Sequence, residues 1–182
     1  MAQTTFQGPV RSLGGIFQQG PASVVTITSS TTLSPSAHGG RIISVGGSLA
    51  ATTTLTLPTI NTSANPTTSG PGQDPNTVNN LGVLYTIWVP TTISTSTLKI
   101  ATNGTGNLFV GSLMGVDTDT GDAIVAYNAL AADSFDNINL NGTTTGGVAG
   151  TWIEIFAIAA NTYMVRGTVN GSGVVATPFA TS

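Results

Sequence analysis

The chain of 182 residues contains no cysteine. Thiol catalysis, thiolate metal sites, iron–sulfur clusters and a disulfide framework are therefore excluded, and the redox compartment cannot be inferred. Charge is also scarce, because only 6% of the residues are Asp, Glu, Lys or Arg, against about a quarter in an average globular domain. The chain must therefore interact with water through hydroxyl and amide groups, above all those of threonine.

Basic residues are few, with four Lys and Arg against seven Asp and Glu. Nucleic-acid affinity depends mainly on clustered cations, so we expect no nucleic acid as a partner. Residues 1–9 have neither the basic nor the apolar region of a secretory signal. The longest apolar run, residues 152–160, is interrupted by Glu154 and is far shorter than the about 20 residues that span a bilayer. We expect no membrane partner and synthesis in a cytoplasm.

Low charge does not predict disorder in this chain. Disordered segments combine low hydrophobicity with high net charge, whereas 40% of these residues are hydrophobic and the net charge is −3. The length suits one domain, and a domain of roughly 150–200 residues buries about 70% of its unfolded surface. The sequence therefore predicts a single domain that folds without disulfide or metal.

Short β-rich runs separated by turn residues begin at residue 24. The predicted strands are residues 24–28, 41–45, 53–57, 83–89, 97–101, 108–116, 138–140, 152–158 and 162–169. In the third run Leu55 and Leu57 alternate with Thr, as in a strand with one buried face. Residues 159–161 can close the last two runs into a hairpin. We therefore predict an all-β fold, a compact β-sandwich or β-barrel domain over residues 23–182.

Nine positions are core candidates: Leu55, Leu57, Ile87, Trp88, Phe109, Trp152, Ile155, Phe156 and Val165. Because Ile87 and Trp88 are adjacent in one strand, they must point to opposite faces of the sheet. The second face of that sheet is therefore predicted to be a subunit interface. The one helical candidate is residues 122–133, where Ile124, Tyr127 and Leu130 are spaced near one helical turn.

Two segments fit no regular element. Residues 1–22 contain repeated Gly and Pro, which favour an extended N-terminal arm over a helix or a ladder strand. The arm's candidate residues for binding another protein are Phe6, Pro9, Val10, Arg11, Leu13, Ile16 and Phe17. Residues 60–82 are rich in Pro, Gly and Asn and predict one long surface loop, a kind of segment that is usually functional or disordered.

The only carboxylate cluster is Asp117, Asp119 and Asp122. Several oxygens on a tightly turning backbone suit a hard cation, so these residues are a weak candidate metal site. The EF-hand pattern is absent, because no Glu stands at the twelfth position and the flanks are predicted strands. The alternative, an acidic turn between strands, is the stronger interpretation.

Other catalytic patterns are equally incomplete. His38, the only imidazole, lies in a turn-like segment without a nucleophile elbow, so we expect an exposed loop histidine. Asp133 and Asp136 could pair with Glu154 as acid and base, but spacing in sequence does not establish the few-ångström separation that glycoside cleavage needs. The glycine-rich residues 142–150 lack the Lys of a phosphate loop and predict a flexible turn. We therefore expect no enzyme and no cofactor.

Four blocks carry a resemblance to a known family. They are residues 6–17 (FQGPVRSLGGIF), 54–58 (TLTLP), 141–147 (NGTTTGG), and 151–155 (TWIEI) leading to 163–167 (YMVRG). Together they resemble small structural proteins of tailed bacteriophages, most of all capsid decoration (cement) proteins. The resemblance covers most of the chain, and its motifs are loose.

The resemblance implies a virion protein on the capsid exterior, made in the host cytoplasm. It would bind the major capsid protein at three-fold or quasi-three-fold lattice positions as a homo-oligomer, often a trimer, and stabilise the head. The arm would contact the capsid protein or a sister subunit. The alternative is a phage fibre or tail accessory module that binds a receptor or carbohydrate, with residues 60–82 as its recognition loop.

Overall fold

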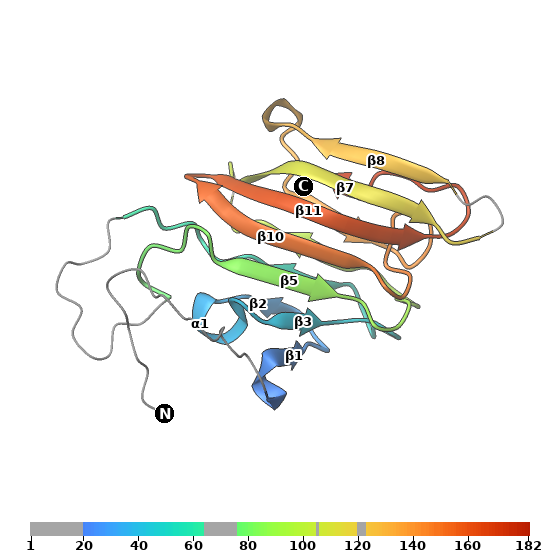
Figure 1. Cartoon of the computed structure of the whole chain (residues 1–182), viewed down its shortest axis with the longest axis horizontal. Helices are drawn as coiled ribbons and strands as arrows, with labels where there is room; N and C mark the ends of the chain where they lie inside the picture. The colour runs from blue at the N-terminus through green and yellow to red at the C-terminus, as the bar shows by residue number, and fades with distance from the viewer. Residues whose placement is uncertain (1–19, 64–75, 105, 120–122) are drawn as a thin grey trace, which may run out of the picture.

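The computed structural model describes residues 20–63, 76–104, 106–119 and 123–182 of the chain. These residues form two mixed β-sheets packed together, which confirms the predicted all-β fold (Figure 1). One sheet has seven strands in the order β1-β3-β5-β10-β11-β7-β8, and the other has five in the order β12-β9-β6-β4-β2. The candidate arm residues Phe6 to Phe17 and residues 64–75 of the predicted loop lie outside the described residues.

The strands of the seven-stranded sheet are β1 (Val24–Thr26), β3 (Ile42–Ser44), β5 (Leu84–Trp88), β10 (Trp152–Ala159), β11 (Thr162–Gly171), β7 (Leu108–Asp117) and β8 (Ile124–Ala129). Those of the five-stranded sheet are β12 (Phe179–Ala180), β9 (Asn137–Leu140), β6 (Leu98–Ala101), β4 (Thr53–Thr56) and β2 (Thr31–Thr32). Three short helical turns complete the described elements: η1 (Pro21–Ser23), α1 (Pro35–His38) and η2 (Ala131–Asp133).

The chain passes between the two sheets after almost every strand. From β1 to β6 each strand belongs to the other sheet from the strand before it. Strands that neighbour each other within a sheet therefore run in the same direction, so β1, β3 and β5 are parallel, as are β2, β4 and β6. The predicted hairpin is confirmed, because β10 pairs antiparallel with β11 around residues 160–161.

The core lies between the two sheets and follows the alternation of each strand. Six of the nine core candidates are fully buried: Leu55, Leu57, Ile87, Phe109, Ile155 and Val165. The prediction is wrong for Trp88, which is 37% exposed, and for Trp152 and Phe156, which are half-buried. Ile153, Ile155 and Ala157 take the inward positions of β10, so the side chains between them must point outward.

One tyrosine connects the two layers. Tyr163 on β11 is fully buried, and its hydroxyl donates a hydrogen bond to the carbonyl oxygen of Pro58, which follows β4 in the opposite sheet. Its ring lies 6.4 Å from that of Phe109 on β7. Burial raises the pKa of Tyr163, so the hydroxyl remains a donor throughout the physiological range.

The predicted helix at residues 122–133 is wrong. The segment forms the edge strand β8, followed by the single turn η2. The helical spacing of its apolar residues does not mark a buried face, since Ile124 is 70% and Leu130 is 62% exposed. Tyr127 instead packs over Gly115 of β7, where an added Cβ would lie 2.4 Å from the ring. Pairing with β7 therefore decides the structure of this segment.

Asparagines hold the two described ends of the long loop together. The backbone N–H of Asn61 donates to Asn80 Oδ1 at 2.8 Å, and the Asn80 N–H donates to the Asn61 carbonyl at 3.1 Å. The buried Asn80 side chain also donates to the carbonyl of Thr59 at 2.8 Å. The loop therefore leaves and re-enters the domain at one point, and no strand lies between β4 and β5 in its described parts.

The glycine-rich residues 142–150 form turns, as predicted, and these turns are packed into the domain. Gly142, Gly146 and Gly147 are buried. The hydroxyl of Thr151, which is fully buried, accepts hydrogen bonds from the N–H groups of Gly147 at 3.2 Å and Asn170 at 3.0 Å. Glycine is needed at these three positions because other atoms occupy the place of a side chain: the backbone of Ile93 at Gly142, and side chains of Val169, Ile93 and Leu140 at Gly146 and Gly147.

The closest such approach predicts the effect of a methyl group. Gly142 has φ +75°, and an added Cβ would lie 1.8 Å from the carbonyl oxygen of Ile93. We expect Gly142→Ala to lower the free energy of unfolding by about 3 kcal/mol or more, from left-handed strain and overpacking together. Urea denaturation measures this change.

Gly47→Ala is the matched control. Gly47 has φ +82° but no atom within 4 Å of its added Cβ. Only the conformational cost of about 1 kcal/mol should remain there. Equal losses in the two variants would contradict the close approach at Gly142.

Candidate functional site

The seven-stranded sheet has an outer face, which points away from the five-stranded sheet. No described helix or strand lies over its central strands β5, β10, β11 and β7 (Figure 1). The strand registers align their outward side chains in rows that cross the sheet.

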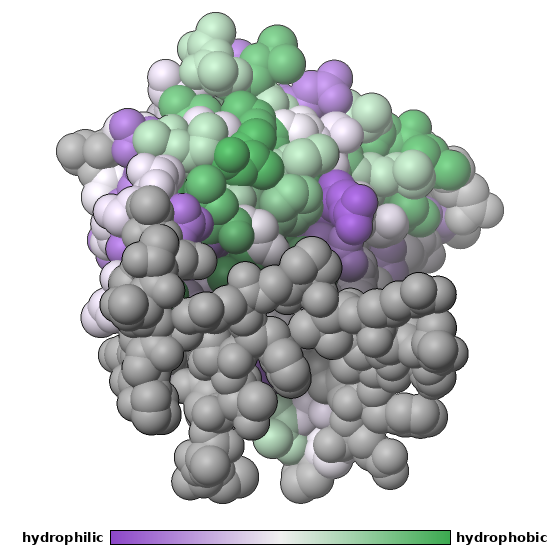
Figure 2. Space-filling model, turned by 60° about the vertical axis from the view of Figure 1, so that its left-hand side comes forward, coloured by the Kyte–Doolittle hydropathy of each residue, from purple (hydrophilic) through white to green (hydrophobic). Residues whose placement is uncertain are grey.

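Three rows cover these four strands in the order β5, β10, β11, β7. The tryptophan row is Trp88, Trp152, Thr168 and Met114. The polar row is Thr86, Glu154, Arg166 and Ser112. The phenylalanine row is Leu84, Phe156, Met164 and Val110. A narrow polar row therefore lies between two rows made mainly of large apolar side chains. The space-filling view shows that apolar residues gather on the surface of the domain (Figure 2).

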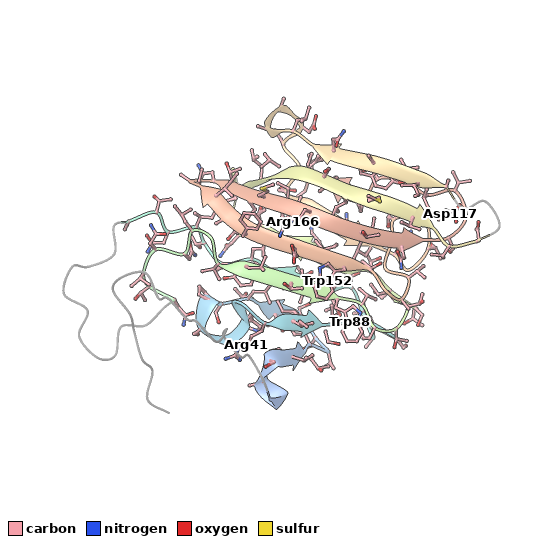
Figure 3. All side chains as sticks on the ribbon, viewed as in Figure 1. Arg41, Trp88, Asp117, Trp152 and Arg166 are labelled. Carbon is pink, nitrogen blue, oxygen red and sulfur yellow. The ribbon has the colours of Figure 1, made fainter. Side chains whose placement is uncertain are left out.

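The two tryptophans lie side by side on this face. Trp88 and Trp152 are directly paired across β5 and β10 (Figure 3). Trp88 is 37% exposed, and Met114 at the other end of the same row is 48% exposed. Exposed aromatic and methionine side chains in one contiguous patch are typical of a surface that binds another molecule. The outer face is therefore the candidate functional site.

The centre of the polar row is an ion pair. Arg166 Nε donates to Glu154 Oε2 at 2.6 Å, and this is the one salt bridge within the described residues. The Arg166 side chain is 61% exposed and that of Glu154 is 20% exposed. Such surface pairs contribute about 0–1 kcal/mol to stability. The importance of this pair therefore lies in its position at the centre of an apolar face.

The acidic cluster is a hydrogen-bonded turn in its described part. Asp117, at the end of β7, is buried, and its Oδ1 accepts from the N–H of Asp119 at 3.1 Å. Asp119 Oδ2 accepts from the N–H of Gly173 at 2.5 Å. Asp122 lies outside the described residues. Among the residues that the structure describes, no three His, Asp or Glu side chains gather as a metal site requires.

His38 is not the exposed loop histidine that we predicted. It is the last residue of α1 and is buried, and its Nδ1 accepts a hydrogen bond from the N–H of Ser34 at 3.0 Å. Burial lowers the pKa of His38 below its ordinary value of 6.5, and the nearby positive charge of Arg41 lowers it further. His38 therefore holds the start of a short helix as a neutral acceptor.

The three carboxylates considered for glycoside cleavage each bind a structural partner. Asp133 Oδ2 accepts from the N–H of Leu130 at 2.8 Å. Asp136 accepts from the N–H of Ser182 at 2.8 Å and from the side chain of Asn137 at 2.6 Å. Glu154 lies on the outer face of the other sheet. The structure therefore does not bring the three together.

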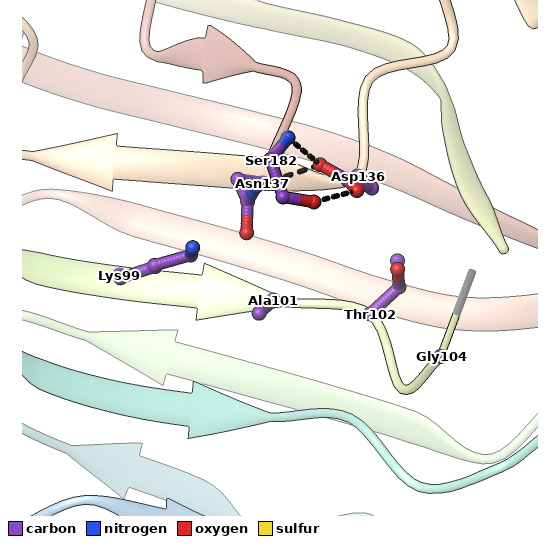
Figure 4. Close-up of a pocket in the computed structure, with 7 residues that line it drawn as sticks. All are labelled: Lys99, Ala101, Thr102, Gly104, Asp136, Asn137 and Ser182. Carbon is purple, nitrogen blue, oxygen red and sulfur yellow. Dashed lines mark hydrogen bonds between the residues drawn. The ribbon is translucent and has the colours of Figure 1, made fainter. Parts of the chain in front are cut away.

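A small pocket lies beside Asp136, with a volume of about 280 Å³. Its lining residues are Lys99, Ala101, Thr102, Gly104, Asp136, Asn137 and Ser182 (Figure 4). The Asp136 carboxylate is bound by Ser182 and Asn137, as the dashed lines show. The lining has one cation, Lys99, and one carboxylate, Asp136, whose oxygens already accept hydrogen bonds from Asn137 and Ser182, and it contains no aromatic side chain.

Sequence reasoning predicted a second face for the strand of Ile87 and Trp88, but it assigned the aromatics of that face, Trp88, Trp152 and Phe156, to the core. A signal was nevertheless present in residues 152–158, where both alternating sets of side chains contain large apolar residues. A strand of this kind must use both of its faces. The pairing of Glu154 with Arg166 depends on the turn at residues 160–161 together with a one-residue irregularity between Ala157 and Ala159, which shifts the register of the hairpin by one.

Comparisons of the chain with protein-family models, with curated proteins and with solved structures found no match. None of the described helices is long and apolar enough to cross a membrane. The function must therefore be argued from the outer face and from the residues that carry the family resemblance.

The buried His38 predicts a pH-dependent stability. The pKa of His38 is lower in the folded state than in the unfolded state, so below pH 6.5 the unfolded state binds more protons. The free energy of unfolding that His38 contributes above this pH is therefore lost as the pH falls below it. In His38→Asn the amide oxygen can replace Nδ1 as the acceptor for the Ser34 N–H. We expect this variant to lose less stability than the wild type from about pH 7.5 to about 5.5. Denaturation at each pH tests this, and parallel curves for the two proteins would contradict it.

Proposed function

We propose that this chain is a structural virion protein that binds the outer surface of a tailed-phage capsid as a decoration protein and stabilises the head. The observation that carries the proposal is the exposed apolar outer face in a chain with only 6% charged residues. Such a surface suits a protein whose work is assembly with other proteins. The capsid as partner comes from the family resemblance.

Three of the four blocks that carry the resemblance lie within the described residues, and they contact each other in the folded domain. Tyr163 of one block donates to Pro58 of another, across the two sheets. Thr151 accepts from the N–H of Gly147, which belongs to a third block. These residues hold the sandwich together and contain no reactive group. This supports a comparison with proteins that have a structural role.

The composition also suits attachment to a capsid. Burial of apolar area and pairing of backbone groups depend little on salt, whereas contacts between exposed charges are screened by it. A binder with 40% hydrophobic and 6% charged residues would therefore stay attached over a wide range of ionic strength.

A second candidate function is the binding of a receptor carbohydrate. Trp88 and Trp152 are adjacent and outward on neighbouring strands, and exposed aromatic rings can contact the apolar faces of sugar rings. Titration of the protein with oligosaccharides, followed by tryptophan fluorescence, separates the two functions. The decoration protein should show no change, whereas saturable quenching that is lost in Trp88→Ala would favour the carbohydrate module.

Deletion of residues 2–20 tests the predicted role of the arm in attachment. These residues lack the alternation of a core strand, but they carry five large apolar side chains, each worth about 1.5–3 kcal/mol if fully buried. We expect capsids that lack the protein to bind the full chain and to lose most binding of the shortened chain. The thermal unfolding midpoint should change little.

The opposite pattern would contradict this assignment. Loss of folding with binding retained would mean that the arm belongs to the core of the domain. Decoration of a lattice requires a fixed number of bound copies per capsid protein at saturation. Binding of the full-length protein without such a fixed ratio would contradict it.

A further inference from the structure

The side chains of the outer face are arranged so that the face is complementary to a second copy of itself. Its two charges, Glu154 and Arg166, lie directly opposite each other on β10 and β11, the two central strands of the rows. β5 and β7 flank this pair on either side, and both place large apolar side chains in the outer rows. If a second copy of the face is turned over onto the first, so that its β10 lies over β11, opposite charges face each other and apolar residues face apolar residues.

We propose that two copies of this chain pair through their outer faces, about a two-fold axis that runs along the strands between β10 and β11. The axis lies in the plane between the two outer faces, one from each copy. It places β10 of each copy over β11 of the other, and β5 over β7. This inference goes beyond the proposed function, because it assigns the outer face to a second copy and leaves attachment to the capsid to the N-terminal arm.

The charges select this axis among the two-fold arrangements of the face. In an isologous interface, residue i contacts j and residue j contacts i. An axis along the strands places Glu154 of each copy against Arg166 of the other, so both contacts are attractive. An axis across the strands at the polar row places Glu154 against Glu154 and Arg166 against Arg166. Like charges in contact are strongly unfavourable in an interface.

The same axis also matches the apolar rows by size. In the tryptophan row, Trp88 would lie over Met114 of the second copy, at the two most exposed positions of that row. In the phenylalanine row, Phe156 would lie over Met164. Methionine is flexible and makes favourable contacts between its sulfur and aromatic rings. Trp88 and Phe156 therefore each meet a flexible methionine, while Trp152 would lie over the small side chain of Thr168.

The size of the face agrees with a stable pair. With about 3.3 Å per residue and about 4.8 Å between strands, the seven strands at their observed lengths cover about 700 Å². A standard interface buries about 800 Å² on each partner. Aligned packing of two sheets at about −30° is common between β-sheets. Two outer faces can therefore pack into one layer, with apolar rows on either side of a central row of paired charges.

The pairing contains two copies and no more. An isologous face is used up when its two-fold partner is bound. The pair therefore differs from the trimer that the family resemblance implies, and the number of copies in the free protein distinguishes the two.

Sedimentation of the purified full chain, without capsids, is the first measurement. We expect a species of twice the chain mass of 18.2 kDa at micromolar concentration. A monomer at every concentration would overturn the proposal, and so would a trimer.

Charge reversal then tests the axis. Glu154→Arg places two arginines on each face and Arg166→Glu places two glutamates, so each single variant should raise the dimer dissociation constant at least tenfold. Mixing the two variants should restore pairing, because every contact between a doubly positive and a doubly negative face is attractive. The double variant, with both substitutions in one chain, should pair with itself. Dimers that persist in both single variants, or a mixture that stays monomeric, would overturn the proposal.

Circular dichroism and thermal unfolding check that each variant folds. If a charge variant fails to fold, Trp88→Glu replaces it and should also raise the dissociation constant at least tenfold. Val174→Glu is the matched control, because Val174 is 88% exposed but lies in the segment between β11 and β12, outside the rows. It should pair like the wild type. Equal pairing of Trp88→Glu and Val174→Glu would overturn the proposal.

Discussion

The alternation of side chains along β10 and β11 is the constraint on which the rest of the structure depends. These two long strands lie in the middle of the seven-stranded sheet and pair with each other and with β5 and β7. Every residue that they bury, such as Ile155 or Val165, obliges its neighbour to point outward. In a chain with so few charged residues, those neighbours are often apolar as well. The core and the exposed outer face therefore arise from the same periodicity.

Much of the fold could be predicted because its signals are local. Strand ranges follow from β-rich runs between turn residues, and the β10–β11 hairpin follows from two such runs separated by a short turn. The predictions that are wrong concern residues whose structure is decided by contact with a segment distant in the sequence. Residues 124–129 have a helical spacing of apolar side chains but pair with β7 along its edge. His38 is buried, and the glycines at 142–147 are packed against Ile93 and Val169, neither of which is near them in sequence.

The candidate site could be predicted only in part. Because Ile87 and Trp88 are adjacent in one strand, both faces of that strand are apolar. The sequence therefore indicates that the second face is also buried or binds another molecule. The rows themselves could not be predicted, because they need the order of β5, β10, β11 and β7 in the sheet. β11 lies beside β7 in a parallel pair whose partners, such as Thr162 and Leu108, are far apart in the sequence. No periodicity within either segment records that pairing.

The alternation of the chain between its two sheets also shapes how quickly the domain can fold. The neighbours β1, β3 and β5 come together only if the intervening β2 and β4 are placed on the other side of the core. Folding rates fall as contacting residues lie further apart in sequence, because the entropy of loop closure is lost before the contacts form. Two antiparallel pairings close locally, β10 with β11 and β7 with β8. Folding should therefore be slow and start from these hairpins, so the segment that holds the ion pair is among the first parts of the domain to form.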